Sequence, residues 1–473
     1  MTVSTVRVRP PEGVRDQIRR WRSLPDARLL AFVALLTVLA GLAVPLAGFL
    51  LAAGLAVVAL LAVVAWRPIL ATYLYLLALP FITGMKRGML IPQVRLNEAL
   101  LGLLLVGACL GGYLRLLRGE RLVPRFTALD GPLVAFVVLS TAWPLAWLML
   151  RGEAPLFSDM TAVFPVVKLV ALFLLVRLTV HTDAQVLRCV RLIGWTGAVV
   201  ALIAILQTLR FGPVVAMLTA LWPDESGLVV ERGTSLLGSP IATGDYIVIS
   251  LALVVSCGLR GLLHPWERLV LGCVLGTGVL AAGQFSTWIA ALVAAVVLLR
   301  RHPEARRRAV RFLPLAGLAL LVGAPAFIGR LSGFGDGFGV PRSWLGRWDN
   351  LTTFYLPELG GFRFLLGVSP NSVLQAPETW REQIFLESGY LQFLWVGGVP
   401  LLLAFCWLSV VVLRTTRRLG ARGDAVGACA AALEIAWWMV LVLSLIDIHI
   451  VLRGAGDLLF TLLAITARRS DDR

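Results

Sequence analysis

Long apolar runs recur along almost the whole chain, and they constrain its fold more than any other feature. A helix needs about 20 apolar residues to cross the hydrocarbon core of a bilayer. Such runs begin near Leu29, Gly48, Ile69, Asn97, Leu129, Ala162, Val190, Ile241, Leu269, Gln284, Phe312, Ser388, Ala430 and Ala455. They lack the alternation of apolar and polar residues that is typical of membrane strands. The sequence therefore predicts an all-α, polytopic integral membrane protein with about 12–14 transmembrane helices.

Composition excludes a soluble globular protein. Hydrophobic residues make up 59% of the 473 residues and charged residues only 15%, and the mean hydropathy is +0.86. Soluble domains usually contain about 45–50% apolar residues. Lipid must therefore solvate most of the surface, and we expect residues 29–467 to form a single transmembrane domain.

The positions of the basic residues predict the orientation in the membrane. The chain has 43 Lys and Arg against 27 Asp and Glu, a formal net charge of +16. Cytoplasmic loops are enriched in Lys and Arg, and the main basic stretches of this chain fall on one side of the predicted map. These stretches are residues 1–28, 115–125, 300–311, 414–422 and 468–473. We therefore expect a multi-pass protein of the cytoplasmic membrane whose N- and C-termini are both cytoplasmic.

The same distribution of charge indicates which kinds of partner the chain binds. The sequence pI is near 10.8, but the positive charge is spread over short loops instead of forming one basic domain, as a nucleic-acid-binding protein would have it. We therefore expect membrane lipids, and no nucleic acid, as partners.

Two predicted outer loops, residues 209–240 and 330–387, are much longer than the other outer connections. Long ordered loops often carry function. The second loop is rich in charged residues, and its stretch 348–366 is aromatic and partly amphipathic. We expect helices there that lie on the outer surface of the membrane.

Three local patterns lie in or beside these loops. They are Arg232-Gly-Thr-Ser-Leu-Leu-Gly-Ser-Pro240, then Pro341-Arg-Ser-Trp-Leu-Gly-Arg-Trp348 with Phe364-Leu-Leu-Gly-Val-Ser-Pro370, and finally Glu387-Ser-Gly-Tyr-Leu-Gln-Phe-Leu-Trp-Val-Gly-Gly398. In their order and in their positions relative to the apolar runs, they resemble the bacterial O-antigen polymerase and O-antigen ligase family. The resemblance spans most of the chain.

This resemblance implies an enzyme that transfers a glycan from an undecaprenyl-diphosphate carrier to a sugar hydroxyl at the outer face of the membrane. It implies no metal and no cofactor, and other polysaccharide-assembly proteins become candidate partners. Glu387-Ser388 stands where the ligases usually have a His-Asn pair, which favours a polymerase. Ligase-type transfer of finished glycan to a lipid or other acceptor remains open. In a different class, so does a flippase for lipid-linked oligosaccharides, although its charges should lie within the spans.

Candidate site residues follow from the chemistry of such a transfer. Without a metal, the departing diphosphate needs guanidinium groups, which present forked donors to phosphate oxygens. Arg232 and Arg347 are the first candidates because they come from the two long loops on one side. Glu387 is the candidate base for the acceptor hydroxyl, and Arg347 is the second catalytic candidate. The further predicted substrate-binding residues are Arg342, Lys168 and Arg453.

Each candidate also has a structural alternative. Arg232 and Arg347 could form surface ion pairs, Glu387 could be a plain N-terminal charge on a helix, and Lys168 could extend to the membrane surface. The group Asp447, His449, Arg453 and Asp457 could line a cavity or pair internally. We favour internal pairing there, with Arg453 as the expected exception.

Overall fold

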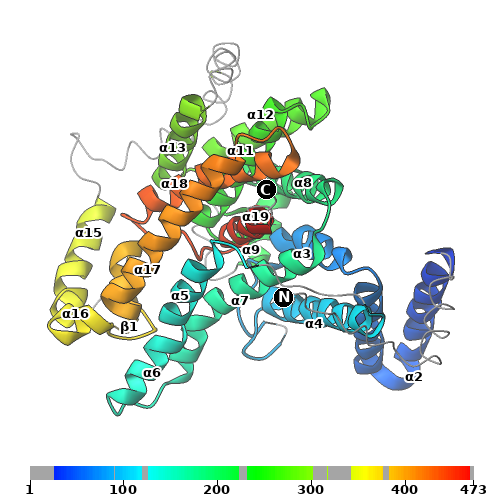
Figure 1. Cartoon of the computed structure of the whole chain (residues 1–473), viewed down its shortest axis with the longest axis horizontal. Coiled ribbons are helices and arrows are strands. Elements are labelled where there is room, and N and C mark those ends of the chain that lie inside the picture. Colours follow the sequence, from blue (N-terminus) through cyan, green and yellow to red (C-terminus); the bar gives the residue numbers. More distant parts are fainter. Residues whose placement is uncertain are drawn as a thin grey trace, which may run out of the picture.

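The computed structural model describes residues 26–89, 91–119, 126–222, 229, 232–301, 317, 342–375 and 383–468. Its helices in chain order are α2 (Asp26–Trp66), α3 (Ile69–Ile82), α4 (Leu96–Leu117), α5 (Asp130–Ser140), α6 (Ala142–Leu150), α7 (Phe157–Thr179), α8 (Asp183–Thr208), α9 (Gly212–Leu221), α11 (Pro240–Leu259), α12 (Pro265–Ala281), α13 (Phe285–Arg301), α15 (Arg342–Asn350), α16 (Phe362–Leu366), α17 (Gly389–Leu419), α18 (Ala425–Leu443) and α19 (Ala455–Arg468). Short helical turns are η2 (Ser235–Leu237), η4 (Leu351–Tyr355) and η5 (Pro357–Leu359). Figure 1 shows how these elements are arranged.

Apolar helices of membrane-spanning length confirm the predicted fold class. Among the described residues, seven helices are long and apolar enough to cross a membrane: Leu96–Leu117, Asp130–Leu150, Phe157–Thr179, Asp183–Thr208, Pro240–Leu259, Gly389–Leu419 and Ala425–Leu443. Shorter apolar helices accompany them, including α3 and α19. The predicted runs are mainly helical where the structure describes them, and of the run from Phe312 only Gly317 is described. The chain is an all-α, polytopic membrane protein.

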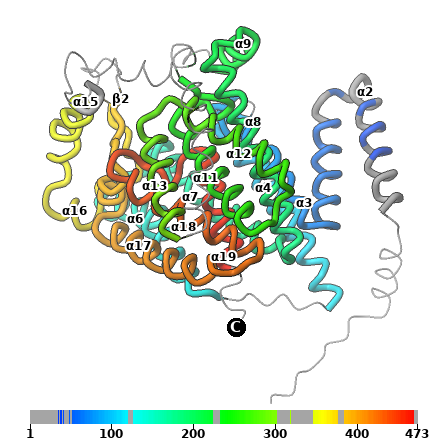
Figure 2. The backbone as a smooth tube through the Cα atoms, turned by 90° about the horizontal axis from the view of Figure 1, so that it is seen from above, coloured from blue at the N-terminus to red at the C-terminus, as the bar shows by residue number. Residues whose placement is uncertain are grey.

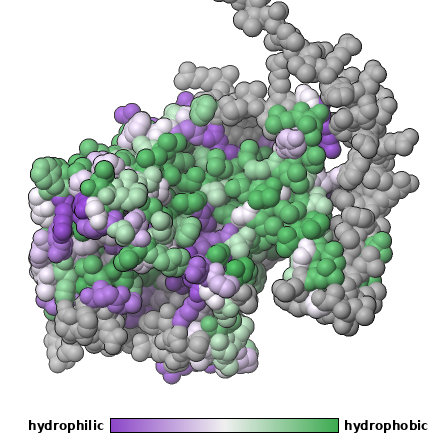
Figure 3. All heavy atoms as spheres, turned by 90° about the horizontal axis from the view of Figure 1, so that it is seen from below, coloured by the Kyte–Doolittle hydropathy of each residue, from purple (hydrophilic) through white to green (hydrophobic). Residues whose placement is uncertain are grey.

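The outward faces of these helices carry large apolar side chains. Val134 on α5 is 60% exposed, Leu292 on α13 is 65% exposed and Leu403 on α17 is 61% exposed. Figure 3 shows the apolar surface that such residues form on one face of the molecule. Exposed apolar area of this extent marks contact with lipid.

Helices α11 and α18 form the centre of the bundle. In each, 83% of the most apolar 18-residue window is buried. Trp437 of α18 is fully buried and stacks on Phe405 of α17, with 6.5 Å between the ring centroids. Figures 1 and 2 show α2 at one edge of the molecule and α15 and α16 at the opposite edge.

Small residues allow the helices to pack closely. A Cβ atom built on Gly278 of α12 would lie 2.5 Å from the Cβ of Ala201 on α8, and one built on Gly197 of α8 would lie 2.7 Å from Ser250 on α11. Gly107 and Gly111 of α4 give the same close approach to residues 61–68 at the end of α2 and just beyond it. Small residues four apart are typical of helix contacts in membranes, where backbones must approach for van der Waals contact.

The structure differs from the predicted pattern in two places. The run from Leu129 is interrupted at Thr141, whose φ of −127° and ψ of −71° separate α5 from α6. The second long loop also contains a small antiparallel sheet, in which β1 (Val373–Gln375) pairs with β2 (Gln383–Phe385). Its strands are three residues long, too short to show a pattern of alternation in the sequence. The run 29–66, in contrast, is interrupted at Gly48 (φ 78°), where a second span was predicted to start.

The close approach of α8 and α12 predicts how substitutions on α12 affect stability. We expect Gly278→Leu to destabilise the purified protein by roughly 1–3 kcal/mol, because the new side chain must displace α8. Gly276 lies on the same helix and has no atom within 4 Å of its built Cβ. Gly276→Leu is therefore the matched control, and its thermal unfolding midpoint should stay at the wild-type value. Equal midpoints for both variants would contradict the packing described here.

Candidate functional site

Several helix ends meet at one end of the bundle, which we call the loop end: α3 and α18 finish there, and α11, α17 and α19 begin. The N–H of Gly389, at the start of α17, donates to the carbonyl of Ser444 after α18 at 2.8 Å. A Cβ atom on Gly389 would lie 3.0 Å from the Ser444 side chain. The segment between α18 and α19, residues 444–454, lies at this end, and we call it the central segment.

The opposite end of the bundle holds arginines of the predicted cytoplasmic loops. Arg301 on α13 and Arg417 on α17 both pair with Glu434 of α18, whose side chain is 6% exposed. Arg260 donates to the carbonyl of Arg422 at 3.0 Å. Described parts of two basic stretches thus lie together with Arg260, away from the loop end.

Arg232 lies in a turn that is held by Gln207, at the end of α8. The Gln207 Nε2 donates to the carbonyls of Val229 and Arg232 at 2.8 and 2.7 Å, and its Oε1 accepts from the N–H of Ser235 at 2.9 Å. Ser235 has φ 48°, a region that non-glycine residues rarely occupy. The first pattern of the sequence therefore has a structural reason: a buried amide fixes the backbone that carries Arg232.

The same turn joins the first turn of α11. The Thr243 hydroxyl donates to the carbonyl of Thr234 at 2.6 Å, and the Ser239 hydroxyl caps α11 by accepting from the N–H of Ala242 at 3.4 Å. Pro240 occupies the first helical position, where its missing N–H costs nothing. Arg232 is thus tied to the start of the central helix.

Arg347 and Glu387 form an ion pair at the loop end. Arg347 lies in the last turn of α15, and Glu387 lies two residues before α17. The two side chains are 30% and 25% exposed, so the pair is open to solvent and neither partner is held in the core. The predicted second phosphate-binding arginine and the predicted base are therefore neighbours.

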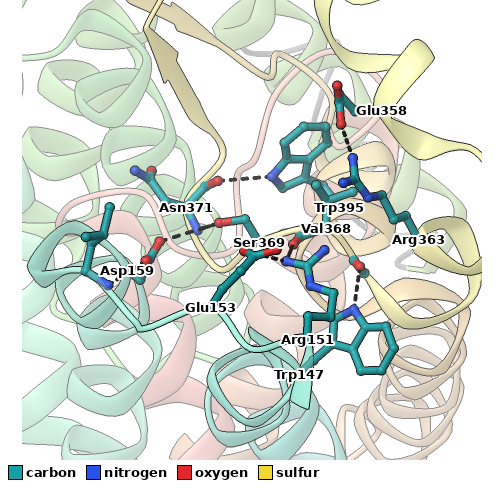
Figure 4. Close-up of polar contacts among 12 residues, drawn as sticks. Trp147, Arg151, Glu153, Asp159, Glu358, Arg363, Val368, Ser369, Asn371 and Trp395 are labelled. Carbon is teal, nitrogen blue, oxygen red and sulfur yellow. Dashed lines mark hydrogen bonds and ion pairs between the residues drawn. The ribbon is translucent and has the colours of Figure 1, made fainter. Parts of the chain in front are cut away.

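The loop that carries this pair is fixed to α6 by successive hydrogen bonds, some of which Figure 4 shows. Two residues on α6 and the residue that follows it, at helical spacing, donate to consecutive carbonyls: Trp143 to Leu366 at 2.9 Å, Trp147 to Gly367 at 3.0 Å, and Arg151 to Val368 at 2.7 Å. Residues four apart share one face of a helix. One face of α6 therefore holds a single extended stretch of the loop.

Glycines bring the same stretch against α17. Gly367 has φ 100°, and a Cβ there would lie 2.7 Å from the carbonyl oxygen of Val396. Gly398 has φ 65° and kinks α17 where Leu365 approaches. Farther along, the Trp395 indole donates to the Asn371 carbonyl at 3.0 Å, as Figure 4 shows. The glycines of the second and third sequence patterns are needed for this close contact between loop and helix.

A buried histidine ties the central segment to α11. The Nδ1 of His449 lies 2.5 Å from the Oδ2 of Asp245, and the two side chains are 0% and 1% exposed. Burial acts to lower the pKa of His449, but the charge and hydrogen bond of Asp245 outweigh it, so the pKa is raised above its ordinary value. Asp447 adds to this rise, and the nearby guanidinium of Arg347 opposes it.

Asp457, at the start of α19, joins three helices. Its Oδ1 accepts from the hydroxyl of Tyr75 on α3 at 2.6 Å, and its Oδ2 accepts from the Nζ of Lys168 on α7 at 2.8 Å and from the N–H of Gly454 at 3.0 Å. Asp457 is 0% exposed and Lys168 is 11% exposed. Lys168 therefore pairs inside the protein and does not extend to the surface.

Further basic side chains lie next to this pair. Arg87 donates to Glu98 of α4 at 2.7 Å, and its Cζ lies 5.3 Å from the ring centroid of Phe164 on α7. Arg95, just before α4, is the next member: burial, and then the charge of Arg453 in the central segment, lower the pKa of Arg95 to about 10. Arg95 stays protonated at neutral pH, so cations accumulate here.

Four of the sequence-predicted residues fall into two groups. Arg347 and Glu387 lie together at α15 and α17, whereas Lys168 and Arg453 lie by α3, α4, α7 and α19. Arg232 lies between α8 and α11. The side chain of Arg342 lies outside the described residues. Asp457 and His449 form internal pairs, as we favoured from the sequence.

Sequence reasoning missed Asp245, Gln207 and the pair Arg87 and Arg95. Asp245 interrupts an apolar run, and an ionisable residue within a span is itself a functional signal. Gln207 closes another apolar run in the same way. Arg87 and Arg95 lie in a short connection, and a connection of this length gave no functional signal in the sequence.

Comparison with known proteins identifies no relative of this chain. Neither a scan against protein-family models nor a search of the curated proteins finds a match to this chain.

The chemistry available at the loop end is that of guanidinium groups beside single carboxylates. Within the described residues, no group of three or more His, Cys, Asp or Glu side chains could hold a metal ion. The arginines can bind phosphate oxygens, Glu387 can accept a proton, and the imidazole of His449, whose pKa Asp245 raises, can hold a proton.

The pair of His449 and Asp245 predicts a dependence of stability on pH. The folded pKa of His449 lies above its unfolded value of about 6.5. The stabilisation by the charged pair is therefore fully present below that value and is lost as the pH rises through the folded pKa. We expect the thermal midpoint to fall over that range in the wild type and to change less in His449→Gln. The variant should also be less stable at pH 6, because it leaves Asp245 without its partner.

His264, an exposed histidine at the opposite end, provides the control for this measurement. His264→Gln should keep the wild-type dependence on pH. If His449→Gln also kept it, the charged pair would not contribute to the pH dependence.

Proposed function

We propose that this chain is a membrane glycosyltransferase of cell-surface polysaccharide assembly. It transfers a glycan from an undecaprenyl-diphosphate-linked donor to a sugar hydroxyl, as an O-antigen polymerase does, at the outer face of the cytoplasmic membrane. The observation that carries the proposal is the Arg347–Glu387 pair at the loop end, where a phosphate-binding group and a proton acceptor are neighbours. The three sequence patterns support it because each helps to build this end of the molecule.

The proposed reaction is a displacement at the anomeric carbon of the donor sugar. The acceptor oxygen forms the new bond to that carbon, the bond from carbon to phosphate oxygen breaks, and the diphosphate leaves with the electron pair. Arg347, with Arg232, stabilises the charge on the diphosphate. Glu387 takes the proton of the acceptor hydroxyl. Bonds, protons and charges balance without a further reactant.

The resting ion pair has a consequence for the order of events. Arg347 cannot offer its full set of donors to a phosphate while Glu387 occupies one of them. In the proposal, the donor diphosphate replaces Glu387 on the guanidinium, and the released carboxylate becomes available as the base. Binding of the donor thus precedes activation of the acceptor.

The proposed orientation places the loop end outside and both termini in the cytoplasm. The arginine-rich end with Arg260, Arg301 and Arg417 then faces the cytoplasm, in agreement with the enrichment of basic residues there. A diphosphate on a lipid carrier lies at the membrane surface, which is where α17 begins. The kinked start of α17 supports a role at this boundary.

Experiments can distinguish two alternative functions from this proposal. Ligase-type transfer of finished glycan to a lipid or other acceptor would use the same arginines and the same base. A flippase for lipid-linked oligosaccharides is favoured by one observation, the buried pairs Lys168–Asp457 and Asp245–His449, because ionisable groups inside a membrane protein often line a transport path. Transfer explains the solvent-open pair Arg347–Glu387 better than transport does.

Substitutions of the pair test the proposal. We expect Glu387→Gln to slow glycan extension by about 10²–10⁴-fold, the usual contribution of a general base. Arg347→Ala should slow it by about 10²–10³-fold, as expected for loss of one group that stabilises transition-state charge, and Arg347→Lys should restore little because it lacks the forked donors. The measurement is the length distribution of lipid-linked glycan in cells that make equal amounts of each variant.

Arg363 provides a matched control. It lies in the same loop and pairs with Glu358, and both side chains are about half exposed. Arg363→Ala should extend glycan at the wild-type rate. Normal extension by Glu387→Gln and Arg347→Ala would remove the basis of the proposed site.

A further inference from the structure

Within the described residues, the group formed by Arg87, Arg95 and Lys168 contains more cations than carboxylates. The carboxylates of this group are Glu98 and Asp457. We call these five residues the α4–α7 cluster. Charges close together in a partly buried place repel strongly, so a surplus of this kind calls for an anion.

The members of the cluster lie close together where α4 packs against α7. Phe164 and Lys168 are four residues apart on α7 and therefore share one face. Arg87 lies over the ring of Phe164 and also reaches Glu98 in the first turn of α4. Arg95 precedes Glu98 by three residues, and its N–H donates to Glu98 at 3.1 Å.

The two carboxylates do not balance the charge of the three cations. Asp457 already accepts from Tyr75, from Lys168 and from a backbone N–H, and it is fully buried. Glu98 accepts from Arg87 and from the backbone of Arg95. The buried Nε of Arg95 donates to no atom of the described residues. A buried guanidinium nitrogen without an acceptor is costly and points to a missing ligand.

The cluster is separate from the pair described above. Its residues come from α4, α7, α19 and the connection before α4, whereas Arg347 and Glu387 come from α15 and the start of α17. The central segment links the two places, because His449 lies near Arg347 and Arg453 lies near Arg95. The central segment thus lies beside both the α4–α7 cluster and Arg347.

We propose that the α4–α7 cluster is a second anion site, which binds the diphosphate of the acceptor's lipid carrier while Arg347 and Arg232 bind that of the donor. The proposal rests on the proposed function, because only an enzyme that joins two carrier-linked glycans needs two diphosphate sites. The two carriers then lie on opposite sides of the central segment. The acceptor hydroxyl reaches Glu387 from the α4 side.

Binding of inorganic pyrophosphate to the full chain in nanodiscs of zwitterionic lipid tests the second site. Titration calorimetry should find two sites in the wild type. Arg95→Gln should weaken one of them at least about tenfold, as expected for loss of one charge-assisted hydrogen bond, and Arg347→Gln should weaken the other. Arg363→Gln is the control and should keep both sites. Identical titrations of Arg95→Gln and the wild type would overturn the proposal.

Two further measurements make this test specific. Arg87→Gln changes a partly exposed side chain in a surface connection, so it should weaken the same site even if Arg95→Gln folds poorly. In glycan extension with purified carriers, Arg95→Gln and Arg87→Gln should raise the KM for the acceptor about tenfold and leave the KM for the donor unchanged. An equal rise in both KM values would overturn the assignment to the acceptor.

Two competing ligands distinguish the possible sources of the anion. A short-chain polyprenyl diphosphate should displace pyrophosphate from the Arg95 site, whereas anionic lipid in the nanodisc should not. Displacement by anionic lipid alone would identify a headgroup site and overturn the acceptor assignment. Failure of the proposed function would look different: pyrophosphate would still bind at both sites, but cells without the protein would have an unchanged glycan profile.

Discussion

The carboxylate of Asp457 is the interaction on which the loop end depends. It is fully buried, and it holds α3, α7 and α19 together through Tyr75, Lys168 and the N–H of Gly454. A buried carboxylate that lost one of these donors would be strongly destabilising. The central segment begins after α18 and ends at this carboxylate, and His449 fixes its middle to Asp245 of α11. Both ion pairs therefore determine where Arg453 and the start of α17 lie.

Glycines and indoles then place the second long loop on this framework. Three donors on one face of α6 hold consecutive carbonyls from Leu366 to Val368, and Gly398 lets α17 bend around the same stretch. The positions of Arg347 and Glu387 follow from this docking. The stretch of the loop around residues 365–368 is thus fixed to α6 and α17, and fixed positions are the condition for aligning a diphosphate with a base in the proposed transfer.

The sequence predicted the helices well because each apolar run must satisfy its own backbone hydrogen bonds in lipid. It also predicted that Asp457 and His449 pair internally. It could not predict their partners, since Tyr75, Lys168 and Asp245 are far away in the chain and only packing brings them together. The sequence could not predict the role of Arg95 for a related reason. Only the packing of α4, α7 and α19 shows that the cations around Arg95 outnumber the carboxylates. Local sequence patterns thus predicted the helices, whereas contacts between residues far apart in the chain determine the geometry of the site.

The most direct measurement is the lipid-linked glycan profile of cells that lack this protein, separated by length and compared with the profile of cells that carry it. Single repeats should accumulate on the carrier, and long chains should be absent. Long chains retained on the carrier would indicate a ligase instead. An unchanged profile would contradict glycan transfer as the function of the loop end.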